Sequence, residues 1–280
     1  MTGWDGADNT EPALFAFETA ISEDHDILTI FRPSFFFLKG HKYDVQRNSS
    51  IMYNEDKIVF HDFKISNKDN YVGLEGLVSH DPNDWLEITV HNFDLADLNG
   101  MIGETVQIGG TLNVEGKLGN VFDTPKFNAE SSATDFTLNN YLVGNLQVFT
   151  NWIEEKGAIE AHGKLLREED ITFAFSGHYF TKREQDNLDF NAVFDQTDIE
   201  FLNAFDDPEL YTNIEGTIDG AISIKGELEN PMVEGEMDVL TSSVKIPMFN
   251  ISVGAQGKLE FFDGEIIEEH LDITDQEGNH

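Results

Sequence analysis

Apolar and polar residues alternate in short runs along nearly the whole chain. In one run Leu86, Ile88 and Val90 are separated by polar residues, and in another Phe173 and Phe175 are. Successive side chains of a β-strand point to opposite faces, so a period of two predicts half-buried strands. Turn-forming residues interrupt the runs about every 8–12 residues, the spacing of antiparallel strands joined by short loops. The pattern therefore predicts an all-β protein.

Two stretches depart from this alternation and predict short helices. The first covers residues 94–99. In the second, residues 197–205, Ile199, Leu202 and Phe205 lie at helical spacing behind a possible cap at Thr197 or Asp198.

Each predicted helix is followed by a strand marked by two glycines and then by a proline. Gly110 and Gly116 precede Pro125, and Gly220 and Gly226 precede Pro231. This predicts an internal repeat of roughly 100–110 residues. We expect residues 1–50 to form an unassigned N-terminal β segment, 51–180 a first β-groove repeat, and 181–280 a second repeat that runs into a truncated third unit.

The charge balance disfavours negatively charged partners. The chain has 53 acidic and 17 basic residues and a formal net charge of -36, which repels nucleic acid and anionic lipid headgroups. No cysteine is present, so disulfides and thiolate metal sites are excluded. No run of about 18 apolar residues occurs, and we expect a fragment whose membrane contacts lie only in missing termini.

Motifs for catalysis or metal binding are absent from the sequence. The nine histidines form no H-x-H or H-x-x-x-H pair, and only His25 lies directly between two carboxylates. The acidic clusters 168–170, 206–207 and 268–269 lack the spacing of an EF-hand. Nucleophile elbows, phosphate loops and dinucleotide fingerprints are also missing. We expect no enzyme, no cofactor and no metal.

The closing part of the chain carries the most distinctive order of motifs. It runs from Asp198-Ile-Glu-Phe-Leu-Asn203 through Ile214–Pro231 and Val233–Met237 to Gly257–Phe262 and Ile273–Asn279. This succession resembles the TamB-like translocation and assembly proteins of the AsmA-like superfamily, particularly those of Bacteroidetes-type bacteria. A looser copy covers residues 51–130, which depart from the pattern at 119–125. The first fifty residues, including Arg32–Leu38, lie outside the resemblance.

The resemblance implies an elongated, repetitive antiparallel sheet curled into a taco or half-pipe, with an apolar concave groove and one or two short helices. It also implies a periplasmic part of an inner-membrane-anchored envelope protein with an Omp85-type outer-membrane partner. The function implied is phospholipid transport and outer-membrane protein assembly. From the residues alone, the phenylalanine-rich alternation is equally typical of a β-sandwich core.

Together, the alternation and the resemblance predict a groove that holds phospholipid acyl chains, with Glu87, Asp189 and Asp219 pointing outward. Two alternatives are a scaffold that pairs with strands of outer-membrane proteins and a closed sandwich that serves as a binding module. The predicted groove residues are Leu86, Ile88, Val90, Leu112, Val114, Ile171, Phe173, Phe175, Leu188, Phe190, Phe194, Ile222 and Ile224.

Overall fold

The protein is all-β, as its alternating pattern predicts. The computed structural model describes residues 12–23, 26–99, 106–205, 212–228, 230–262 and 265–275. These residues form 18 β-strands and three short 3-10 helices. No helix within these ranges is long and apolar enough to cross a membrane. The chain divides into two compact units, residues 1–134 with 149–152 and residues 135–148 with 153–280.

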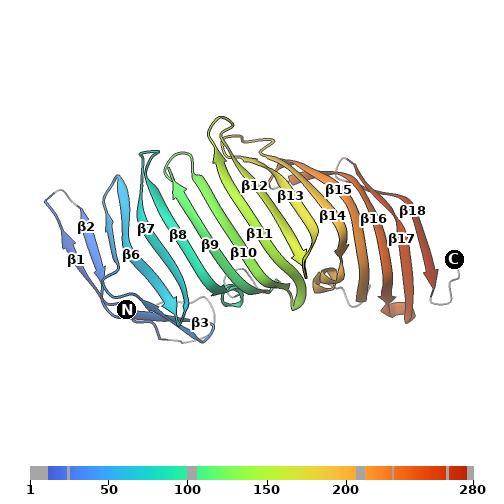
Figure 1. Cartoon of the computed structure of the whole chain (residues 1–280), viewed down its shortest axis with the longest axis horizontal. Helices are drawn as coiled ribbons and strands as arrows, with labels where there is room; N and C mark the ends of the chain where they lie inside the picture. Colours follow the sequence, from blue (N-terminus) through green and yellow to red (C-terminus); the bar gives the residue numbers. More distant parts are fainter. Residues whose placement is uncertain are drawn as a thin grey trace. The chain divides into compact units, whose positions relative to one another are not determined.

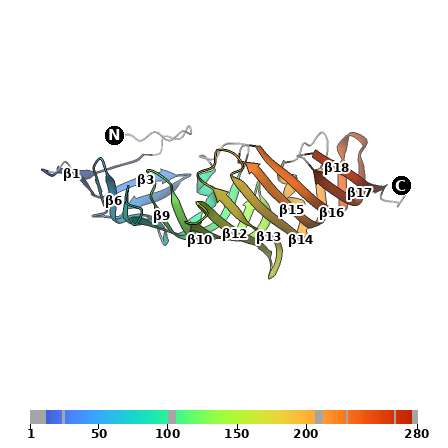
Figure 2. The ribbon, with the colours of Figure 1, turned by 90° about the horizontal axis from the view of Figure 1, so that it is seen from above.

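Unit 1 is an antiparallel sheet with a hairpin inserted at one end (Figures 1 and 2). Strands β6 to β9 pair in chain order, and β6 pairs with β5 along its first half and with β4 of the β3–β4 hairpin along its second. The unit contains β1 (Phe17–Ile21), β2 (Ile27–Phe31), β3 (Ser34–Leu38), β4 (His41–Val45), β5 (Ser50–Tyr53), β6 (Lys57–Asn67), β7 (Asn70–Ser79), β8 (Trp85–Asp94), helix η1 (Leu95–Leu98), β9 (Ile108–Gly119) and most of β10 (Lys126–Leu138).

Unit 2 is a ladder in which each strand from β12 to β18 pairs with the next strand along the chain. It is therefore one sheet, not the two packed sheets of a sandwich. The unit contains most of β11 (Tyr141–Ile153), β12 (Ala158–Arg167), β13 (Asp170–Phe180), β14 (Leu188–Asp198), helix η2 (Glu200–Phe205), β15 (Thr212–Glu227), β16 (Asn230–Ile246), helix η3 (Pro247–Phe249), β17 (Ile251–Phe262) and β18 (Glu265–Asp275).

Four strands contain a residue with left-handed backbone whose N–H is bound by a side chain of a later strand. Three of the four coincide with a register shift, which marks a β-bulge and increases the local twist of a sheet. The polar side chain replaces the ladder partner that the N–H loses there. The donor and acceptor pairs are Asp62 with Glu75 (2.6 Å), Asn92 with Asn113 (2.9 Å), Asp135 with Asn145 (2.8 Å) and Gln196 with Asp219 (2.7 Å).

Both predicted helices are confirmed, as the 3-10 helices η1 and η2. The carboxylate before each helix caps it: Asp94 accepts from the N–H of Ala96 at 2.9 Å, and Asp198 accepts from that of Glu200 at 2.7 Å. Asp198, one of the two predicted caps, is therefore the capping residue. Helix η3 was not predicted from the sequence.

An asparagine after the cap ties each helix to the strand that follows. The side chain of Asn99 bonds both the N–H (2.7 Å) and the carbonyl (2.9 Å) of Ile108, and Asn203 does the same with Ile214 (2.6 and 2.7 Å). We call these two arrangements the asparagine clamps. The two stretches share the order Asp, Leu or Ile, two variable residues, Leu, Asn, so the internal repeat has a structural basis.

The repeat aligns differently from the sequence prediction at both of its glycines. Gly110 and Gly216 both have left-handed backbone, and three residues later Asn113 and Asp219 bind the bulge of the preceding strand. Gly110 therefore corresponds to Gly216 and not to Gly220. At the far end of the strand the predicted equivalence of Gly116 and Gly226 is wrong, because the register equates Gly116 with Ile222: each lies three residues after the side chain that binds the bulge. Strand β15 has 16 residues against 12 in β9, and β15 extends two residues further at each end.

Candidate functional site

One face of the sheet in unit 1 is almost continuously apolar. Leu86 and Val90 of β8 lie opposite Leu118 and Val114 of β9, while Ile88 lies opposite Gly116. Leu112 shares this face because it lies two residues from Val114 on the same strand. The five predicted groove residues of this unit, Leu86, Ile88, Val90, Leu112 and Val114, are thus brought together.

Unit 2 also has an apolar face, and this face is richer in aromatic rings. Phe173 lies opposite Phe194, with ring centroids 5.0 Å apart, and Phe175 and Phe190 lie 6.4 Å apart. Ile224 lies opposite Phe190 on the next strand. The register therefore places seven predicted residues on one face: Phe173, Phe175, Leu188, Phe190, Phe194, Ile222 and Ile224. We refer to these two surfaces as the apolar faces of unit 1 and unit 2.

Phenylalanines on the apolar faces lie directly opposite glycines. A Cβ on Gly163 would come within 2.5 Å of the Phe175 ring, so the ring occupies the space that the missing side chain leaves. Such pairing covers the glycine and allows the ring to lie flat against the backbone. The pairs are Phe60 with Gly76, Phe175 with Gly163, Phe190 with Gly177, Phe194 with Gly220 and Phe261 with Gly235.

The apolar faces are only partly covered. Of the predicted groove residues Leu86 is buried, with 6% of its surface exposed, whereas eleven others are half-buried. A residue in a filled core would normally lose nearly all contact with water. Apolar side chains in continuous rows that keep part of their surface in water can bind an apolar ligand.

Ile171 is the exception among the predicted groove residues. It lies beyond a register shift in β13, opposite Leu166, and is 48% exposed. The shift interrupts the alternation that predicted its orientation, because a bulge breaks the regular succession of faces.

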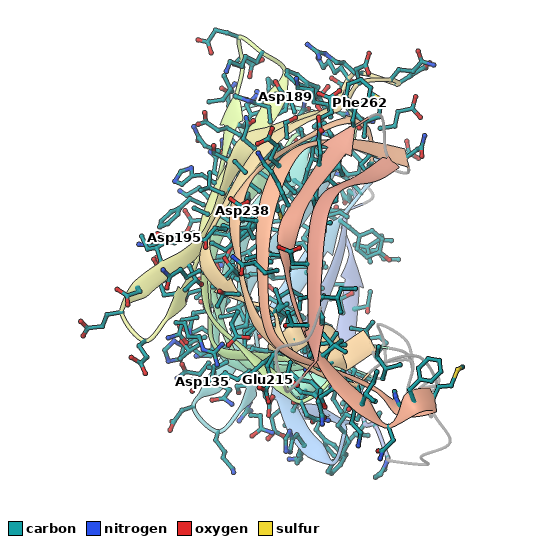
Figure 3. The ribbon with its side chains drawn as sticks, turned by 90° about the vertical axis from the view of Figure 1, so that its right-hand side faces the viewer. Asp135, Asp189, Asp195, Glu215, Asp238 and Phe262 are labelled. Carbon is teal, nitrogen blue, oxygen red and sulfur yellow. The ribbon has the colours of Figure 1, made fainter. Side chains whose placement is uncertain are left out.

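In each unit the face opposite the apolar face is polar and acidic. Glu87 forms an ion pair with Lys117 at 2.7 Å, and Asp189 and Asp219 are exposed, as predicted. Figure 3 labels Asp189, Asp195 and Asp238 on the strands of unit 2. Asp219 lies directly opposite Asp238, two like charges that weaken the pairing of their strands.

The acidic clusters singled out from the sequence form no site that the structure describes. Residues 168–170 are exposed: Glu168 and Glu169 form the turn after β12, and Asp170 begins β13. His25 and residues 206–207 lie outside the described residues, and the side chains of 268–269 are not described.

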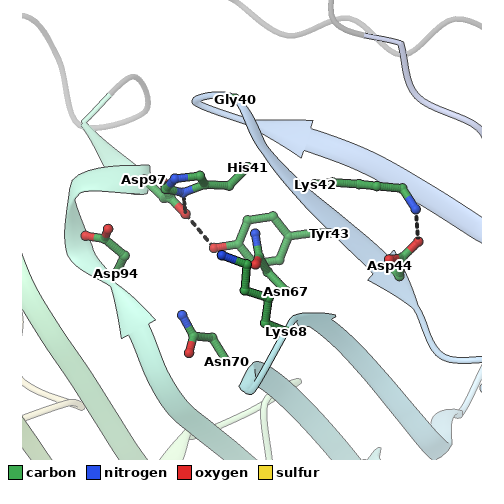
Figure 4. A pocket seen from close by; sticks show the side chains of 10 residues that line it. All are labelled: Gly40, His41, Lys42, Tyr43, Asp44, Asn67, Lys68, Asn70, Asp94 and Asp97. Atoms are coloured by element: carbon green, nitrogen blue, oxygen red, sulfur yellow. Dashed lines mark hydrogen bonds and ion pairs between the residues drawn. The ribbon is translucent and has the colours of Figure 1, made fainter.

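A polar pocket in unit 1 brings together residues that are distant in sequence (Figure 4). It has a volume of about 450 Å³ and is lined by β4, by the turn between β6 and β7, and by the junction of β8 and η1. Asp97 lies at this junction and is only 2% exposed. Its carboxylate accepts hydrogen bonds from Nδ1 of His41 at 2.8 Å and from the hydroxyl of Tyr43 at 2.5 Å.

The electrostatics of the pocket follow from the burial of this carboxylate. Burial raises the pKa of Tyr43 far above its ordinary range, and the hydrogen bond to Asp97 raises it further. Tyr43 is therefore a fixed hydrogen-bond donor. Asp94 lies beside these groups, and oxygen or nitrogen atoms of His41, Asp94 and Asp97 all lie within 4.8 Å of one another.

Sequence reasoning missed this cluster because its histidine is isolated along the chain. One signal could have found it. In the shared order of the two copies, Asp97 occupies the position that Phe201 occupies in the second copy. A carboxylate where the other copy has a phenyl ring indicates an added role.

Comparisons of the chain with models of protein families, with characterised proteins and with solved structures found no match.

Proposed function

We propose that this chain is a segment of a non-enzymatic, TamB-like periplasmic protein of the cell envelope, and that its apolar faces carry phospholipid acyl chains between the inner and outer membranes. The observation that supports this most directly is the half-exposed row of phenylalanine, leucine and isoleucine side chains that crosses consecutive strands of each unit. Assembly of outer-membrane proteins with an Omp85-type partner belongs to the same proposal and rests on the sequence resemblance.

The energetics favour such a role for an apolar face. Each methylene that leaves a membrane for water costs about 0.8 kcal/mol, so a two-chain lipid with about 30 methylenes meets a barrier of order 20 kcal/mol. Burying the chains against a continuous apolar surface removes much of this cost. In this proposal the apolar faces form the inside of a groove, and the acidic opposite face keeps the outside in water.

The test compares two substitutions on the same strand. Phe190 and Val193 both lie on β14 but on opposite faces, and Val193 is 53% exposed. We expect the wild-type chain and V193D to retain co-purifying phospholipid in native mass spectrometry and to extract fluorescent phospholipid from vesicles. F190D should lose both properties while keeping its circular dichroism spectrum.

The proposal is contradicted if the folded wild-type chain carries no lipid and extracts none, or if F190D and V193D behave alike. Binding of outer-membrane strand peptides without any lipid binding would favour the strand-pairing alternative.

A further inference from the structure

We infer that His41, Asp94 and Asp97 form a binding site for one divalent cation of the zinc class. The three residues offer one nitrogen and two carboxylate ligands, and they converge from β4 and from the junction of β8 and η1. Mixed nitrogen and carboxylate donors suit zinc and similar transition ions, whereas calcium takes six to eight oxygen ligands.

Asp97 is arranged as a ligand would be. Nδ1 of His41 lies 2.8 Å from Oδ1 and 3.1 Å from Oδ2 of Asp97, and Oδ2 also accepts a hydrogen bond from the Tyr43 hydroxyl at 2.5 Å. Hydrogen bonds of this kind orient ligating carboxylates in metal sites. For Nδ1 to bind a cation, its proton must leave and the ring must carry a proton on Nε2 instead. The side chain of His41 is 52% exposed, so water can exchange that proton.

Asp94 supplies the third ligand through the oxygen that it does not use as a cap. Its Oδ1 accepts from the N–H of Ala96, which leaves Oδ2 available. Ligand atoms around a tetrahedral ion lie about 3.4 Å apart, because zinc bonds to nitrogen and oxygen are about 2.1 Å long. In this structure the ligand atoms of the three residues lie within 4.8 Å of one another. A small rotation of the half-buried Asp94 side chain would bring them to the shorter separation. The adjoining cavity of about 450 Å³ has room for water as the fourth ligand.

The second copy of the repeat serves as an internal control. It builds the same cap and the same asparagine clamp with Phe201 in the place of Asp97, so the scaffold does not require a carboxylate there. Burying a charge without a compensating cation is costly. Within the described part of the chain, His41 is the group found in an ion pair with Asp97. A bound cation would complete the neutralisation of this buried charge.

The test titrates the 280-residue chain with Zn²⁺ in competition with a coloured zinc indicator. We expect one site that is at least about 10- to 100-fold weaker in H41Q and in D97N, because losing only a partner of a ligand already costs that much. His61 provides the matched control, because its Nδ1 also lies beside a carboxylate, that of Glu75 at 3.1 Å, but in an exposed pair. H61Q should bind as the wild type does, and Ca²⁺ should not compete.

Since Asp97 is buried, D97N could unfold locally, and the exposed H41Q variant then decides the outcome. The inference is overturned if the wild-type chain shows no saturable Zn²⁺ binding, or if H41Q binds with wild-type affinity. Equal losses in H41Q and H61Q would also overturn it, because they would indicate scattered surface binding.

Discussion

At the scale of single residues, the apolar faces depend on glycine as much as on phenylalanine. At Gly177 a Cβ would overlap the carbonyl oxygen of Asp189 and lie 2.5 Å from Cα of Phe190. Backbone atoms cannot move aside as a flexible side chain can. Glycines that look like strand-weakening residues in the sequence therefore hold the aromatic rings in place.

We predict that Gly177→Ala destabilises the protein by about 1–3 kcal/mol, the usual cost of overpacking. Gly73→Ala is the control, since its nearest neighbour would lie at 3.8 Å and its backbone is not left-handed. Urea unfolding followed by tryptophan fluorescence measures both. Equal midpoints for the two variants would contradict this account of the glycines.

The asparagine clamps are a second feature in which a single side chain contributes to folding stability. We predict that Asn203→Ala costs about 2–3 kcal/mol, because it removes three hydrogen bonds, and two of these pair the N–H and the carbonyl of the buried Ile214. Asn191→Ala, at an exposed position of β14, should have little effect in the same unfolding measurement. Amide exchange at Ile214 should quicken only in the first variant.

At the scale of elements, alternation predicted the strands well, because one face of each is apolar and the period of two is strict. It failed where bulges break that period, as at Ile171. The helical stretches were found from spacing and caps, although their 3-10 geometry was not. The cluster around Asp97 could not be predicted, since a carboxylate in a short helix between strands normally indicates exposure and its partners are more than fifty residues away.

At the bulge of Asp62, the pKa values of Glu75 and His61 depend on their neighbours. The N–H of Asp62 lowers the pKa of Glu75, and Glu75 raises the pKa of His61. We predict that Glu75→Gln returns the pKa of His61 toward its ordinary value, as read from the histidine resonances in an NMR titration. Glu87→Gln, on the neighbouring strand, should leave the pKa of His61 unchanged.

The lowered pKa of Glu75 also determines at which pH this carboxylate stabilises the folded protein. Because the folded pKa of Glu75 is lowered, its contribution is present above the unfolded value of about 4.3 and disappears as the pH falls through the folded value. Glu75→Gln should therefore lower stability at pH 7 and have no such effect near pH 2. A loss of equal size at both pH values would assign the effect to packing instead.

At the scale of the whole molecule, the net charge of -36 opposes folding through self-repulsion. We predict that raising NaCl from about 20 mM to about 0.5 M increases the thermal midpoint by several degrees, since salt shortens the Debye length. The triple variant D189N, D195N and D238N should show a higher midpoint at low salt and a smaller salt response. A midpoint that falls or stays constant with salt would refute this.

The longer second copy of the glycine-marked strand shows how such a chain can change in length. Its four extra residues lie two at each end, so the side chains between keep their faces, whereas an insertion inside the strand would preserve the later faces only if it were even. A single inserted or deleted residue would turn the apolar row toward water unless a new bulge absorbed it. Over evolutionary time insertions and deletions inside these strands should therefore come in steps of two, so that internal changes of odd size are found only where a bulge has been gained or lost.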